Sequence, residues 1–112
     1  MKNKKISGIY IITNKQNNKS YIGQSSDIYK RWKKHKQEKN NFENHFELYE
    51  DMRKYGLSNF TFKILEITPL LYTLDYKEIY YIKKYNTYIP NGYNKTHGGH
   101  SGININTSGL RV

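Results

Sequence analysis

Hydrophobic positions change their spacing along the chain and divide it into strands and helices. Residues 6–13 are rich in β-branched and aromatic side chains and form too short a run for a helix, which favours a strand. Polar residues 14–19 predict a turn, and residues 20–23 predict the returning strand of a hairpin. Residues 59–68 alternate between two faces and predict a third strand, which Pro69 ends.

Three helices are expected around these strands. Apolar and ring side chains recur at helical spacing over residues 27–39, and Ser and Asp residues at the start suit an N-cap. A second helix is expected over 44–55, ended by Gly56, and a third over 73–85, capped by Thr73. The order β-β-α-α-β-α predicts an α+β fold, in which a small antiparallel sheet is flanked by helices.

The length of 112 residues suits one domain. We expect this domain to occupy residues 1–99, and residues 100–112 to be a Gly-, Asn- and Ser-rich tail or the start of a linker. The absence of cysteine excludes disulfides, thiolate catalysis and zinc sites built on cysteine. No apolar run approaches the roughly 18 residues of a membrane span, and the starting residues MKNKKIS lack the apolar segment that a signal peptide needs. We therefore expect a cytoplasmic protein without membrane contacts.

Positive charge is concentrated in the first third of the chain. The formal net charge is +10, of which residues 1–41 carry +9 and residues 42–112 only +1. Such a one-sided basic field favours a polyanionic partner, most often nucleic acid.

Glu78 is the sharpest local anomaly. It shares a helical face with residues that otherwise suit a core, namely Leu71, Leu74, Tyr81, Ile82 and Tyr85. A buried carboxylate is costly unless it is paired, hydrogen-bonded or bound to a metal. The alternative is an ordinary surface glutamate at the edge of the apolar face.

Arg31 and His35 lie one turn apart on the face that also carries Ile28 and Trp32. Their functional interpretation is an arginine that binds phosphate beside a histidine that hydrogen-bonds or exchanges a proton. The structural alternative is an arginine stem along the core and a histidine with satisfied hydrogen bonds.

Tyr10 and Tyr21 lie on the two strands of the hairpin, each near a glycine, Gly8 or Gly23. Glycine within a strand often marks the close approach of a backbone or a ligand. A half-buried tyrosine in a hairpin is, however, more often a packing residue than a catalytic one.

These residues resemble, in their order, the GIY-YIG nuclease family. The two tripeptides that name the family are present as Gly8-Ile9-Tyr10 and Tyr21-Ile22-Gly23. The resemblance spans residues 6–99 and continues through Gln24-Ser25, Arg31, His35, Tyr55-Gly56, Asn59-Phe60, Glu78 and Gly92-Tyr93-Asn94.

The resemblance implies a three-stranded antiparallel sheet flanked by helices and metal-dependent hydrolysis of DNA phosphodiesters. Glu78 would be the single protein ligand of one Mg²⁺ or Mn²⁺ per active site, and the metal would polarise the phosphate and stabilise the departing 3′ oxygen. Arg31 would hold the non-bridging phosphate oxygens. Tyr10 or Tyr21 would position the attacking water and is a candidate to deprotonate it.

The other site residues follow from the same resemblance. His35 is expected to hydrogen-bond a tyrosine hydroxyl, and Asn94 to support the site. Positive surroundings from Arg31, His35 and the metal are expected to lower the pKa of the catalytic tyrosine from about 10. The residues expected to contact nucleic acid are Gly23, Gln24, Lys30, Arg31 and Lys34. One metal and one carboxylate imply a product with a 5′ phosphate and a 3′ hydroxyl.

The glycine-rich ending and the Lys-, Asn- and Ile-rich composition resemble the homing-type branch of the family, found in phages and introns. Members of that branch commonly carry a separate DNA-recognition region after the nuclease domain, so we expect such a region or a protein partner to supply specificity. The implied setting is the cytoplasm of a bacterium or of a phage-infected host. The alternative is a basic DNA-binding module that has lost catalysis, since phosphate contacts alone give salt-sensitive affinity.

Overall fold

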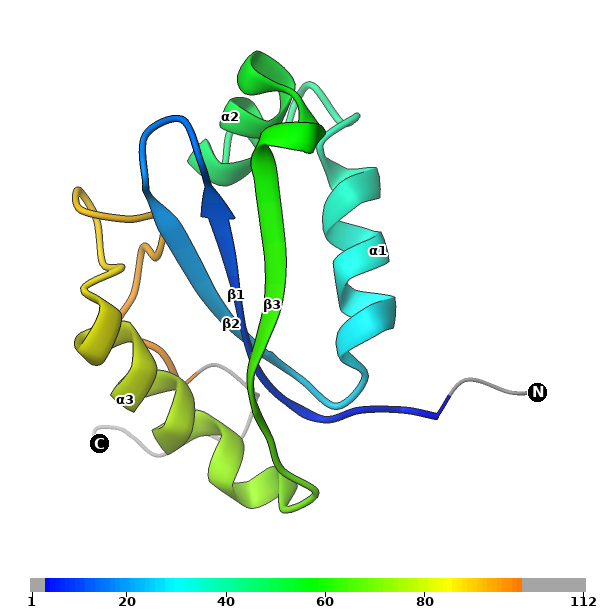
Figure 1. The fold of residues 1–112 in the computed structure, drawn as a ribbon, viewed down its shortest axis with the longest axis vertical. Coiled ribbons are helices and arrows are strands. Elements are labelled where there is room, and N and C mark those ends of the chain that lie inside the picture. The colour runs from blue at the N-terminus through cyan, green and yellow to red at the C-terminus, as the bar shows by residue number, and fades with distance from the viewer. Residues whose placement is uncertain (1–3, 100–112) are drawn as a thin grey trace.

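The computed structural model describes residues 4–99, and the tail predicted at residues 100–112 lies outside the described residues. The elements follow the predicted β-β-α-α-β-α order (Figure 1). The strands are β1 (Gly8–Asn14), β2 (Ser20–Ser25) and β3 (Phe60–Ile67), and the helices are α1 (Ile28–Glu38), α2 (Glu47–Tyr55) and α3 (Leu74–Tyr85). Short 3-10 turns precede β3 and α3, at Leu57–Asn59 and Leu71–Thr73.

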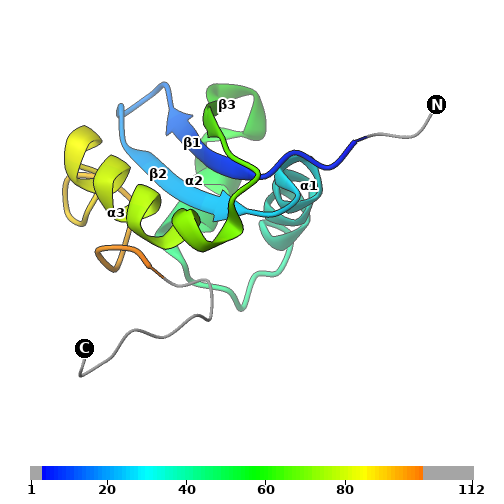
Figure 2. The same cartoon turned by 90° about the horizontal axis from the view of Figure 1, so that it is seen from below.

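The three strands form an antiparallel sheet in the order β2-β1-β3, as expected. Because neighbouring side chains on a strand point to opposite faces, Ile9 and Tyr10 belong to different layers of the core. Helices α1 and α2 cover the Tyr10 face, and α3 covers the Ile9 face. Figure 2 shows α1 and α3 on opposite sides of the sheet.

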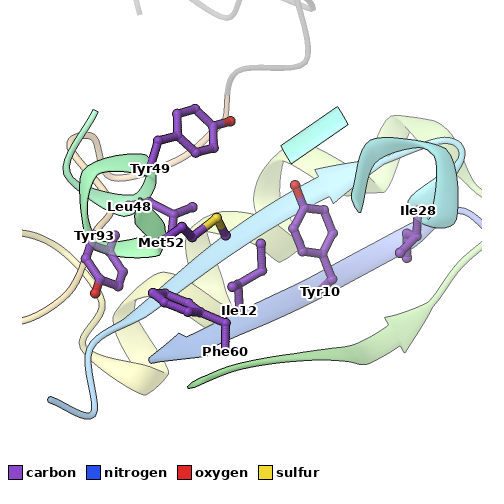
Figure 3. Close-up of a cluster of buried hydrophobic side chains, with 8 residues drawn as sticks. All are labelled: Tyr10, Ile12, Ile28, Leu48, Tyr49, Met52, Phe60 and Tyr93. Carbon is purple, nitrogen blue, oxygen red and sulfur yellow. The ribbon is translucent and has the colours of Figure 1, made fainter. Parts of the chain in front are cut away.

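The larger core cluster joins the sheet to α1, α2 and the segment after α3 (Figure 3). Its buried members are Tyr10, Ile12, Ile28, Leu48, Tyr49, Met52, Phe60 and Tyr93. Its three tyrosines, Tyr10, Tyr49 and Tyr93, bring hydroxyl groups into this layer, and such groups need hydrogen-bond partners when buried. Within residues 4–99 no helix is both long enough and apolar enough to pass through a membrane.

Helix α2 begins three residues later than predicted, at Glu47 instead of Asn44. The side chain of Asn44 accepts a hydrogen bond from the backbone N–H of Phe46 and donates one to Glu38, and such local bonds compete with helix formation. Thr73 is the N-cap residue of α3, as predicted, but its hydroxyl donates to the Leu70 carbonyl and accepts no hydrogen bond from the helix.

The predicted apolar face of the third helix is correct at its centre and wrong at its ends. Leu74 and Ile82 are buried against the sheet, whereas Leu71 and Tyr85 are exposed. Leu71 lies in the 3-10 turn before α3, so the helical spacing that predicted its burial does not apply there.

Candidate active site

The candidate site lies around β2, which forms one edge of the sheet. Tyr21 packs with the layer covered by α1, whereas Gln24 hydrogen-bonds to residues of α3 on the other face. No neighbouring strand separates the two faces along this edge, so groups from both layers can meet there.

Tyr10, His35 and Tyr49 form a buried chain of hydrogen bonds. The Tyr10 hydroxyl lies 2.7 Å from His35 Nε2, and the Tyr49 hydroxyl lies 2.7 Å from His35 Nδ1. Burial, together with the charge of Arg31, lowers the pKa of His35 to about 3, so the ring is neutral near pH 7. A neutral imidazole accepts through one nitrogen and donates through the other, which matches two hydroxyl partners. The expectation that His35 adds positive charge is therefore wrong, because burial keeps it neutral.

Arg31 lies beside the two hairpin tyrosines. Burial opposes the charge of Arg31, but interactions with Tyr10 and Tyr21 outweigh it and raise the arginine pKa. Burial raises the pKa of Tyr10 above its usual range, and burial followed by the negative charge of Glu78 raises the pKa of Tyr21 to about 12. Arg31 opposes both increases. The expected lowering of a tyrosine pKa is therefore not found in this structure, because desolvation outweighs the nearby guanidinium.

Glu78 is buried on α3, as its anomalous position indicated, with 6% of its surface exposed. Its Oε1 accepts hydrogen bonds from Gln24 Nε2 at 3.1 Å and from the backbone N–H of Gly99 at 2.8 Å. The same Gln24 nitrogen donates to Asp75 Oδ1 at 2.8 Å, and Asp75 is equally buried. Sequence reasoning missed Asp75, although it precedes Glu78 by three residues and so shares its helical face. The predicted lone carboxylate is in fact one of a pair joined by an amide.

Asn94 holds β2 from its open edge. Its Oδ1 accepts from the backbone N–H of Ile22 at 2.9 Å, and its Nδ2 donates to the Ile22 carbonyl at 2.9 Å. The Thr87 hydroxyl also donates to Oδ1, at 2.7 Å. The carboxamide thus replaces the peptide group of a missing neighbouring strand, and it fixes the backbone between Tyr21 and Gly23. This is a supporting role, because all of these contacts are with the protein.

Tyr21, Glu78 and Asn94 line one cavity of about 220 Å³. The remaining lining residues are Phe46, Lys95 and Thr96, none of which the sequence predicted as site residues. The structure thus brings Tyr21 and Glu78 together from opposite faces of the sheet. Tyr10, Arg31 and His35 lie on the α1 side of Tyr21, and neither Tyr10 nor His35 is exposed enough to touch a bound ligand.

A second concavity, of about 610 Å³, lies between the end of β2 and α1. It contains Lys30, Arg31 and Lys34, three of the predicted nucleic-acid contacts, and it adds Lys5 and Lys33. Ser25, Ser26, Asp27 and Gln37 complete its lining. The sequence did not predict Lys5, because its position beside α1 depends on how the N-terminal segment folds. The run of lysines at the start of the sequence did indicate a basic segment there.

Two other predicted nucleic-acid contacts have internal roles. Gly23 is buried opposite Tyr10, where a side chain would overlap the tyrosine ring, so it presents no surface to a nucleic acid. The Gln24 amide is occupied by Asp75 and Glu78.

The residues around Glu78 fit a hard divalent cation that keeps most of its water. Among residues 4–99 there is no cluster of three or more His, Cys, Asp or Glu side chains that could form a protein cage. Mg²⁺ is commonly bound by one or two carboxylates, water and substrate phosphate, because it loses water reluctantly. Glu78, at a cavity wall and fixed by two hydrogen bonds, meets that requirement, and Mn²⁺ suits the same ligands.

The structure places a tyrosine pair, an arginine and a glutamate of a helix around one edge of a three-stranded sheet. This arrangement is that of a catalytic domain. The family model described as the GIY-YIG catalytic domain matches residues 6–94, and the chain belongs to this family.

Named relatives agree with this assignment. The chain is 40% identical over 92 residues to intron-associated endonuclease 1 of Enterobacteria phage T4, a match that covers 79% of this chain and 36% of that protein. It therefore spans little more than a third of the curated relative. A solved structure of the catalytic domain of the homing endonuclease I-TevI is similar with a TM-score of 0.71 and 36% identity, covering 80% of this chain and 98% of that one. A mutant of that domain gives a TM-score of 0.74 and 35% identity, covering 83% and 96%.

Proposed function

We propose that this chain is the catalytic domain of a homing-type DNA endonuclease that hydrolyses phosphodiester bonds with one Mg²⁺ or Mn²⁺ per site. The observation that carries the proposal is that Tyr21 and Glu78 face one cavity, with Arg31 beside the tyrosine. These residues offer an oxygen that positions water, a carboxylate for a hard cation and a permanent cation for phosphate.

Tyr21, and not Tyr10, is the phenol that reaches the substrate in this proposal. Tyr21 lines the cavity, whereas the Tyr10 hydroxyl is buried and bonded to His35. With a pKa of about 12, Tyr21 is protonated at neutral pH, so its oxygen acts first by accepting a hydrogen bond from the attacking water. Tyr10 and His35 act as positioning residues that hold the tyrosine and Arg31 in place.

Arg31 neutralises the non-bridging oxygens as negative charge develops on the phosphate. A divalent cation held by Glu78 would supply Lewis-acid stabilisation of the phosphate and of the departing 3′ oxygen. Gln24 and the Gly99 N–H hold one carboxylate oxygen of Glu78, which orients the other. The expected products carry a 5′ phosphate and a 3′ hydroxyl.

The basic concavity of Lys5, Lys30, Arg31, Lys33 and Lys34 is the proposed path of the DNA backbone next to the site. Such contacts carry no sequence information. Because the chain matches about a third of its phage relative, we propose that specificity comes from a further DNA-recognition region or a protein partner, within a bacterial or phage-infected cell.

Nicking of supercoiled plasmid tests the proposal. The wild-type chain should nick with Mg²⁺ or Mn²⁺, and Glu78→Ala or a chelator should abolish nicking. Salt-sensitive DNA binding by both proteins without cleavage would instead support the inert binding module, for which the basic concavity is the structural argument.

A further inference from the structure

Lys95 lies in the cavity that contains Tyr21 and Glu78, at the end of a fixed segment. Asn94, directly before it, is clamped to β2, and its backbone N–H donates to the Thr87 carbonyl at 2.9 Å. The backbone position of Lys95 is therefore set by the same contacts that fix β2.

The Lys95 side chain is held by an aromatic ring. Its Nζ lies 5.3 Å from the ring centroid of Phe46, which lines the same cavity. A cation is attracted to the face of an aromatic ring, and this attraction orders an otherwise flexible side chain. Within residues 4–99 the ion pairs are those of Lys19, His45 and Lys77, so no carboxylate of the described chain neutralises Lys95.

A cation in this cavity would balance the negative charge that a bound phosphate brings. Lys95 is the one cation among its described lining residues, and Glu78 is the one anion. Arg31 lines the basic concavity and approaches this cavity from the α1 side, through its interaction with Tyr21. A phosphodiester brings one negative charge, and the attacking oxygen adds more as the bond forms, so cations at the cavity wall stabilise the reacting phosphate.

We infer, on the basis of the proposed nuclease function, that Lys95 contacts the DNA phosphate in the cavity as a second cation beside Arg31. Lys95 would thus be a catalytic residue of this chain, placed by Asn94 and oriented by Phe46.

DNA binding tests this contact independently of cleavage. The full chain with Glu78→Gln is titrated with a short duplex in EDTA over a range of salt concentrations, with and without Lys95→Met. Loss of one phosphate contact should weaken binding about eightfold at 0.1 M salt and reduce the salt slope by about 0.9. Lys54→Met is the matched control, because Lys54 lies 5.1 Å from the Tyr55 ring centroid but lines neither cavity. Unchanged affinity and slope, or an equal loss in the control, would overturn the inference.

Measurements of DNA cleavage distinguish a failure of the Lys95 inference from a failure of the proposed nuclease function. In the otherwise wild-type chain, Lys95→Met should slow single-turnover nicking by at least about tenfold, and Lys95→Arg should restore most of the rate. Unfolding temperatures within a few degrees of the parent would show that both variants fold. A wild-type chain that binds DNA without nicking it would refute the nuclease proposal, and the binding comparison would still decide the role of Lys95.

Discussion

Gly23 lies opposite Tyr10 in the paired strands, and a Cβ at Gly23 would overlap the tyrosine hydroxyl and the end of its ring. Gly23, the glycine of the Tyr21-Ile22-Gly23 motif, is therefore needed to leave room for the side chain of Tyr10, the tyrosine of the Gly8-Ile9-Tyr10 motif. Tyr10 can lean across β2 and reach His35 because its neighbour has no side chain.

Gly23→Ala should therefore displace the Tyr10 ring and break its bond to His35. We expect a loss of about 1–3 kcal/mol in the free energy of unfolding, the usual cost of overpacking a core, and a large loss of nicking. Urea unfolding in a double-mutant cycle checks this, because the shorter side chain of Tyr10→Leu should make Gly23→Ala nearly neutral. Additive effects of the two substitutions would contradict the proposed overlap.

The two hairpin tyrosines should respond differently to loss of the hydroxyl. Tyr21→Phe should lower the nicking rate about a hundredfold and change the unfolding temperature little, because Tyr21 faces the cavity. Tyr10→Phe leaves the Nε2 atom of buried His35 without its partner, while Nδ1 keeps Tyr49, and should cost about 1–2 kcal/mol of stability. Rate and unfolding measurements on both variants decide the assignment, and the opposite pattern would make Tyr10 the residue that positions water.

The element order and the motif residues could be predicted from the sequence because they depend on local patterns. Alternating strands, a hairpin and a carboxylate on an apolar helical face are all visible within short windows. The burial of Glu78 confirmed the last of these interpretations.

Properties that depend on long-range packing could not be predicted in the same way. The pKa of Tyr21 rises instead of falling because burial outweighs Arg31, and burial depends on how α1 packs on the sheet. The roles of Asp75 and Lys95 likewise depend on which loop and strand residues approach them. The sequence analysis singled out neither residue, although the spacing of Asp75 and Glu78 puts them on one helical face.

Metal binding at Glu78 should be measurable without DNA. Mn²⁺ at about a hundred times its dissociation constant should stabilise the wild-type fold by about 2.7 kcal/mol, because a ligand that binds only the folded state shifts unfolding. Glu78→Gln should lose most of this shift, whereas Glu43→Gln, at an exposed position, should keep it. Thermal unfolding with and without EDTA provides the measurement. An equal shift in Glu78→Gln would place the metal elsewhere.

Asn94→Ala should destabilise the sheet edge. It removes the partners of the Ile22 N–H and carbonyl, and an unsatisfied buried polar group costs about 1–3 kcal/mol. We expect a loss of about 2–4 kcal/mol in urea unfolding and a slower nicking rate. Asn91→Ala is the control, since its side chain makes an exposed bond to Asn86. Equal stability of the two variants would contradict the role of the Asn94 side chain in holding the backbone of Ile22.

The buried histidine should make stability depend on pH. The unfolded chain protonates His35 near its ordinary pKa of 6.5, whereas the folded chain does so only near 3. The unfolded state therefore binds more protons between these values, and stability falls as the pH falls below about 6.5. The contribution at pH 5 is about 2 kcal/mol. Urea unfolding between pH 7.5 and 5 should show that the stability of the wild type falls with pH, whereas that of His35→Asn should not fall in this way. An equal dependence of stability on pH in both proteins would contradict a neutral His35 ring.

The clamp at β2 joins residues that are 72 positions apart in the chain. During synthesis the hairpin with both tyrosines leaves the ribosome first, and the carboxamide that completes its edge leaves much later. A partly made chain therefore holds Tyr21 on an unsupported strand, without Asn94 and without a closed cavity. In the proposed nuclease, the site would therefore be complete only after Asn94 has left the ribosome, so cutting of DNA would begin only with an almost complete domain.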